Sequence, residues 1–81
     1  PSTAPERKKR LSPWEQSELD ALPDLIASAE AELAALDATL ADPKLYARPV
    51  DELRRIQSQR EGAERRVSAL LARWEELEAR A

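Results

Sequence analysis

The chain has no cysteine, histidine, methionine or phenylalanine among its 81 residues, and it has only one glycine. Without cysteine there is no disulfide framework and no thiol redox chemistry. Zinc and other transition metals lose their preferred ligands when cysteine and histidine are both missing. One glycine cannot form a glycine-rich phosphate loop. These absences argue against an enzyme, and we expect no catalytic residue, metal site or cofactor in this chain.

Long apolar runs and aromatic side chains are also scarce. No stretch approaches the roughly 18 apolar residues of a membrane span, and the N-terminus lacks the apolar region of a secretory signal. We therefore predict no membrane partner. Aromatic residues make up 4% of the chain, which gives little bulk for a globular core at a size where compact domains are already marginal. The start at a proline, in a polar basic stretch, suggests a piece or end domain of a longer protein.

The abundant residues are alanine, leucine, glutamate and arginine, a mixture typical of long helices and coiled coils. Residues 13–42 carry eight acidic side chains and no basic one, whereas residues 43–81 carry nine basic and seven acidic side chains. The net charge of −3 therefore says less about partners than this segregation does. Residues 1–11 are polar and basic with nothing to bury, and we expect them to form a flexible linker.

A first helix is predicted over about residues 13–41. Ser12 is a favourable N-cap, Pro13 suits the first helical position, and Glu15 completes a capping box. Pro23 removes a backbone hydrogen bond inside the helix and should bend it. Apolar residues recur at alternating steps of three and four, which is a sustained heptad pattern. They are Leu19, Leu22, Ile26, Ala29, Leu33, Leu36 and Leu40.

Two prolines, Pro43 and Pro49, interrupt this pattern and predict a connection over residues 42–49. A second helix is then expected over about residues 50–80, so that the domain covers residues 12–81. Its apolar or core positions again recur at steps of three and four. They are Leu53, Ile56, Arg60, Ala63, Val67, Leu70, Trp74, Leu77 and Ala81.

A short connection makes two such helices antiparallel neighbours. The acidic first helix also has no basic residue of its own, whereas the second helix supplies arginines that could neutralise it. The sequence therefore predicts an all-α fold, an antiparallel two-helix coiled-coil hairpin with a short connecting turn and a disordered basic N-terminal tail.

The register of the hairpin has two solutions one heptad apart. The preferred register places Leu19 opposite Leu70 and brings Trp14 close to the other tryptophan. In this register Arg60 lies opposite Ala29, over which its long side chain would extend. Sliding one helix by one heptad keeps the apolar layers but leaves Trp14 without a partner.

Three short motifs occur in order along most of the chain. They are Leu11-Ser12-x-x-Glu15-x-x-Glu18-Leu19-x-x-Leu22-Pro23-x-x-Ile26, Leu40-Ala41-Asp42-Pro43-x-Leu45-Tyr46 and Arg73-Trp74-Glu75-Glu76-Leu77-Glu78. Together they resemble the C-terminal domain of Uup-type ABC-F proteins, which are tandem ATP-binding cassette proteins. The basic linker before that domain has its counterpart in Arg7-Lys8-Lys9-Arg10.

The resemblance implies a coiled-coil hairpin associated with DNA binding, in a cytoplasmic parent protein that uses ATP and Mg. The ATPase domains of the same protein and the ribosome or ribosomal RNA are further partners that it implies. The Walker and signature motifs of the ATPase are absent from this chain, so the resemblance carries no nucleotide site over to it.

The candidate DNA contacts are lysines and arginines that could meet phosphates without reading sequence. Three groups qualify, in the tail, in the turn region and on the second helix. They are Arg7, Lys8, Lys9 and Arg10; Lys44, Arg48, Arg54 and Arg55; and Arg65, Arg66 and Arg73. The sequence therefore predicts a non-catalytic, non-sequence-specific DNA-binding accessory domain.

An alternative function is a structural hairpin that docks on the ATPase domains or the ribosome. Leu25 and Leu71, which flank the apolar pattern, would then matter most. The acidic residues of the first helix are interpreted as a solvated face rather than a Mg²⁺ or Ca²⁺ site. Trp14 and Trp74 are interpreted as apolar anchors rather than base-stacking platforms, and Tyr46 as packing across the turn.

Overall fold

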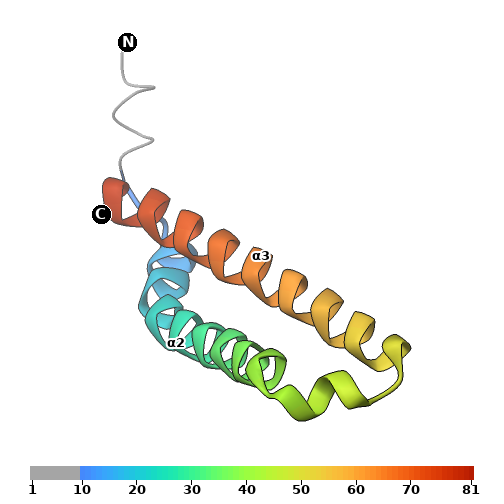
Figure 1. The fold of residues 1–81 in the computed structure, drawn as a ribbon. Coiled ribbons are helices and arrows are strands. Elements are labelled where there is room, and N and C mark those ends of the chain that lie inside the picture. The colour runs from blue at the N-terminus through green and yellow to red at the C-terminus, as the bar shows by residue number, and fades with distance from the viewer. Residues whose placement is uncertain (1–9) are drawn as a thin grey trace.

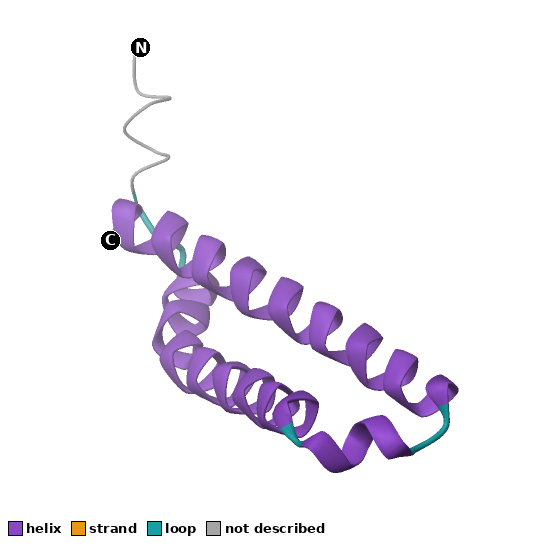
Figure 2. Ribbon diagram, viewed as in Figure 1, coloured by secondary structure: helices purple, strands orange, loops and turns teal. Residues whose placement is uncertain are grey.

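The structure is a computed structural model that describes residues 10–81. Its elements are helix α2 (Pro13–Ala41), the short 3-10 helix η1 (Pro43–Ala47) and helix α3 (Val50–Arg80). Figure 1 shows α2 and α3 running antiparallel, with η1 closing one end of the hairpin. Figure 2 shows that helices make up nearly all of this part of the chain, joined by short loops. The predicted all-α helical hairpin is confirmed.

The start of α2 is held by the capping box that the sequence predicts. The hydroxyl of Ser12 accepts a hydrogen bond from the backbone N–H of Glu15 at 3.1 Å. The carboxylate of Glu15 in turn accepts one from the backbone N–H of Ser12 at 3.0 Å. Two N–H groups that the helix cannot satisfy internally thus find partners.

The closed end is held by the residues around the two prolines. The carboxylate of Asp42 accepts a hydrogen bond from the backbone N–H of Lys44 at 3.0 Å, which caps η1. Leu45 is buried beneath this turn. The hydroxyl of Tyr46 donates to the carbonyl of Leu40 at 2.7 Å, so it satisfies a carbonyl in the last turn of α2. The Tyr46 ring itself stays largely exposed.

The core is a narrow seam between the two helices. Leu19, Leu22 and Leu77 form its buried cluster at the open end, and Trp74 and Leu70 pack against them. The predicted core position Ala81 is wrong, because Ala81 is exposed beyond the end of α3. The other remaining core positions of both helices are buried or half-buried along the same seam. They are Ile26, Ala29, Leu33, Leu36, Leu40, Leu53, Ile56, Arg60, Ala63 and Val67.

The preferred register is wrong, and the helices instead adopt the register one heptad away. Leu77, which is 0% exposed, packs with Leu19. In the preferred register Leu77 would lie beyond the first turn of α2 with nothing to cover it. Trp14 is the residue left outside, with 81% of its surface exposed. The burial of a leucine in the seam therefore outweighs a contact between the two tryptophans.

The predicted placement of Arg60 over Ala29 is wrong for the same reason. In the observed register Arg60 of α3 lies opposite a later part of α2, where it forms an ion pair with Asp37. It also reaches Glu64 on its own helix at 3.1 Å. Ala29 is instead fully enclosed, at 1% exposure.

Pro23 lies inside α2 without ending it. Its ring leaves the carbonyl of Leu19 without the usual i→i−4 partner, which opens that side of the helix. In Figure 1 the light-blue first turns of α2 run in a different direction from the green turns that follow.

We expect Leu77→Ala to destabilise the hairpin by about 3 kcal/mol, because it deletes a fully buried leucine from a small core. The free energy of unfolding, measured by urea titration with circular dichroism, tests this. Val50→Ala is the control, since Val50 is mostly exposed, and it should change stability little. An equally small effect of Leu77→Ala would contradict the observed register.

Candidate nucleic-acid interface

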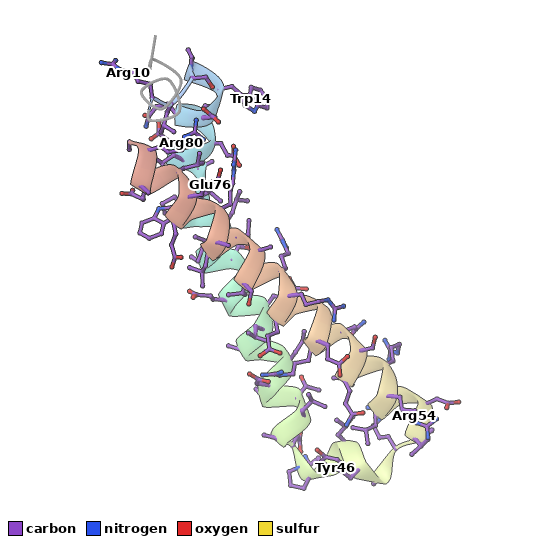
Figure 3. All side chains as sticks on the ribbon, turned by 90° about the horizontal axis from the view of Figure 1, so that it is seen from above. Arg10, Trp14, Tyr46, Arg54, Glu76 and Arg80 are labelled. Carbon is purple, nitrogen blue, oxygen red and sulfur yellow. The ribbon has the colours of Figure 1, made fainter. Side chains whose placement is uncertain are left out.

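The predicted phosphate-contacting residues lie at three separate places. Arg7, Lys8 and Lys9 lie outside the described residues. Arg10 is exposed at the open end, where its carbonyl accepts a long hydrogen bond of 3.4 Å from Arg80. Figure 3 shows Arg10 and Arg54 at opposite ends of the hairpin. Because α3 has 31 residues, these ends are about 46 Å apart, and the structure does not bring tail and turn into one patch.

The closed end carries four exposed cations. Arg48 forms an ion pair with Glu52 at 3.1 Å. The other three make no ion pair within residues 10–81, and their charges face solvent. They are Lys44, Arg54 and Arg55.

The cations predicted on α3 differ in their surroundings. Arg65 is exposed and forms no ion pair in the described part of the chain. Arg66 approaches Glu32 of α2 at 3.7 Å. Arg73 is half-buried and clamps Glu18 of α2 through two hydrogen bonds of 2.7 and 2.8 Å. A guanidinium held in this fork-to-fork geometry is committed to its carboxylate.

Arg73 also donates to Glu76 of its own helix at 3.0 Å. The hydrogen bonds to Glu18 and Glu76 raise the pKa of Arg73 above its ordinary value. The hydrogen bond from Arg73 in turn lowers the pKa of Glu18 below its ordinary value of 4.5. Each partner therefore stabilises the charged form of the other, and the ion pair links the two helices.

Arg80 was not among the predicted site residues, yet it joins the ends of the chain. It donates to both carboxylate oxygens of Glu15 at 3.0 Å. Two hydrogen bonds lower the pKa of Glu15 below its ordinary value. The larger effect comes from the backbone N–H of Ser12, and the next from the side chain of Arg80. The spacing of Arg66, Arg73 and Arg80, seven residues each, was a signal that they share one flank of α3.

Other kinds of site find no support in the described residues. Residues 10–81 contain no group of three or more acidic side chains placed to hold a metal ion. Neither helix in this part of the chain combines the length and apolarity needed to cross a bilayer.

Comparison with known proteins fits this hairpin. The family model described as "ABC transporter C-terminal domain" matches residues 10–79. The chain belongs to this family. It is also 32% identical over 77 residues to the ATP-binding protein Uup of Escherichia coli K12, covering 95% of this chain. The match spans only 12% of that relative's length. No solved structure matches the chain. The predicted resemblance to the C-terminal domain of a Uup-type ABC protein is confirmed.

The ion pairs between the helices of this ABC transporter C-terminal domain predict a dependence of stability on pH. Glu15 and Glu18 have folded-state pKa values below the ordinary 4.5. Their contribution to stability is therefore complete above about pH 4.5 and is lost as the pH falls through the lowered values. Thermal unfolding measured by circular dichroism between pH 7 and pH 3 should show the midpoint falling below pH 4.5.

Glu18→Gln should lower the unfolding midpoint at pH 7 and reduce its fall in acid, because the group that titrates is gone. The matched control is Glu30→Gln, the same change on an exposed residue of α2 without an ion pair in the described structure. A Glu18→Gln curve that coincides with that of the unmodified chain would show that the Arg73 clamp contributes nothing.

Proposed function

We propose that this chain is a non-catalytic accessory domain of an ABC-F ATPase of the cytoplasm that binds DNA through its phosphates. The observation that carries the proposal is the set of exposed cations without ion pairs in residues 10–81. They are Arg10, Lys44, Arg54, Arg55 and Arg65. Cations already matched by a carboxylate gain little from a phosphate, whereas these keep their full charge for a polyanion.

The spacing of the free cations suits a nucleic-acid backbone. Arg54 and Arg65 are eleven residues apart on α3, which is close to three full turns, so they lie on the same side of the helix. Their separation of about 16 Å spans about five phosphates of one strand of B-DNA. Lys44 and Arg55 extend the charge around the closed end. Such contacts position the protein on the backbone and do not read sequence.

The position of the acidic residues is compatible with this role. Glu15, Glu18 and Glu32 are engaged by arginines of α3, so part of the negative charge of α2 is neutralised inside the hairpin. DNA that follows the outer side of α3 would meet Arg54 and Arg65, with the exposed Glu61 between them. The resemblance to Uup-type proteins favours DNA as the polyanion, and structured RNA is the competitor to compare.

The test is fluorescence anisotropy of a labelled duplex of about twenty base pairs, titrated with the chain at several salt concentrations. We expect a slope of log K against log salt of about −3 to −5, because each phosphate contact contributes about −0.9. Replacing Lys44, Arg54 and Arg55 together by glutamine should weaken binding and make the slope less steep. A second variant with residues 7–10 changed to glutamine measures how much of the duplex affinity the N-terminal tail contributes.

Arg54→Gln and Arg66→Gln form a matched pair, with the same change of charge on the same helix. Arg54→Gln should reduce the slope by about 0.9. Arg66→Gln should reduce it less, because Glu32 already faces Arg66. Absence of duplex binding at low salt would overturn the DNA-binding proposal.

A protein-docking hairpin is the second candidate, favoured by the exposed Leu25. Of the two leucines that this alternative invokes, Leu25 is 42% exposed, whereas Leu71 is half-buried beside the seam. Docking on the ATPase domains or the ribosome through Leu25 would be disrupted by Leu25→Glu and would respond little to salt.

A further inference from the structure

One flank of α2, here called the α2 flank, exposes two large apolar side chains that the core of the hairpin does not use. Trp14 is 81% exposed and Leu25 is 42% exposed. Both lie on the same side of the helix as a series of residues at alternating steps of three and four. The α2 flank consists of Trp14, Glu18, Ala21, Leu25, Ser28, Glu32 and Ala35.

A groove between the two helices opens on this same flank, farther toward the closed end. Half of its lining residues have small side chains, and the lining also includes the ion-paired Glu32 and Arg66. Its other lining residues are Ala35, Leu36, Thr39, Gln59, Gly62 and Ala63. The groove therefore offers a shallow, mostly apolar hollow that continues the row of small residues on the flank.

Gly62 has no role in the packing of the hairpin itself. It is the only glycine of the chain, and it lies in the middle of α3, where glycine is the least favourable residue after proline. No residue from 10 to 81 has a positive φ angle. A Cβ atom on Gly62 would meet only the end of the Arg65 side chain, at 3.8 Å. The glycine keeps the groove open, and a side chain from outside is what would need that space.

The α2 flank is symmetric about Leu25. Trp14 lies eleven residues before Leu25, and Leu36 in the groove lies eleven residues after it, about 16 Å in each direction. Turning a second copy end for end about Leu25 also brings Ala21 near Ser28, so that small side chains meet beside the axis. We propose that the α2 flank is the interface of an antiparallel dimer with its twofold axis at Leu25. Trp14 of each copy occupies the groove beside the glycine of the other.

Self-complementarity is what a twofold interface requires, because the same patch must serve both copies. The flank and groove together are about 37 Å long from Trp14 to Thr39. Burying the Trp14 side chains of both copies in the dimer would remove roughly 300 to 500 Å² of surface from water. This is the scale of a small interface, so we expect a weak dimer.

The polar residues on the flank permit this contact. Glu18 and Glu32 are its acidic residues, and each is paired with an arginine of α3 within its own copy. The end-for-end arrangement places the Glu18 pair of one copy against the Glu32 pair of the other, so no unpaired charge is buried. A serine hydroxyl on a helix can donate to the carbonyl one turn before it, so Ser28 needs no water in the contact. Salt should therefore change the dimerisation little.

The bend at Pro23 favours the same arrangement. Pro23 lies nine residues from Trp14, which puts the two on opposite sides of α2. A proline opens the side of the helix on which it lies, so the first turns lean toward the side that carries Trp14. This brings Trp14 toward a partner on the α2 flank.

Sedimentation equilibrium of the whole chain over about a hundredfold range of concentration is the first test. We expect the average mass to rise toward twice that of the monomer. Trp14→Ser should weaken the dimer at least tenfold and leave the helicity of the monomer unchanged, because Trp14 is not part of the core. A chain that stays monomeric at every concentration would overturn the proposal, and the α2 flank would then be a candidate surface for a different protein.

Gly62→Leu separates dimerisation from folding. Leucine is a better helix former than glycine, so the monomer should unfold at a higher temperature, by about 4 °C. The same leucine fills the groove and should abolish the dimer. Gly62→Ala is the matched control, which gains helix stability and fills little of the groove. A Gly62→Leu chain that dimerises as the unmodified chain does would overturn the proposal.

The absence of native cysteine allows the axis to be located directly. Leu25→Cys places one thiol on each side of the axis, within reach of a disulfide. We expect this variant to form disulfide-linked dimers under mild oxidation faster than Ser58→Cys, a control on the exposed side of α3. Equal rates would place the axis elsewhere and overturn the arrangement. None of these readouts involves nucleic acid, so they succeed or fail independently of the proposed DNA binding.

Discussion

The rest of the structure depends on the burial of Leu77 against α2. A hairpin of two helices has a single seam, and its core is one stripe of each helix wide. Leu77 is completely enclosed with Leu19 and Leu22 at the open end of this seam. That contact selects the register, and the register decides which arginine of α3 faces which acidic residue of α2.

The register thereby divides the cations into two groups with different roles. Arg60, Arg73 and Arg80 lie where α2 offers a carboxylate, and they link the helices. Arg54 and Arg65 lie on the outer side of α3, where α2 supplies no acid. Cations of the first group stabilise the pairing of the two helices, and those of the second group remain available to a polyanion.

The sequence was sufficient for the hairpin because each local signal agreed with the others. The Ser12–Glu15 capping box, the heptad steps and Pro43 all act over a few residues, which is the range that a sequence pattern encodes. The register was not predictable in this way, since a heptad repeat looks the same after a shift of seven residues. It was decided at the open end, where covering Leu77 left Trp14 exposed, and the partner of Arg60 changed with it. Candidate cations could be counted from the sequence, but their pairing required the register.

The same choice of register explains why the two proposed activities use different surfaces. Burying Leu77 places Trp14 outside the core, next to apolar residues of the α2 flank, whereas Lys44 and Arg54 stay at the closed end. In the antiparallel dimer the two closed ends would lie at opposite extremes of the assembly. Two weak phosphate-binding sites held far apart can engage one long nucleic acid together, and the second contact then gains from effective concentration. A dimer of this shape would bind long DNA more tightly than short DNA, without any contact beyond those in each hairpin.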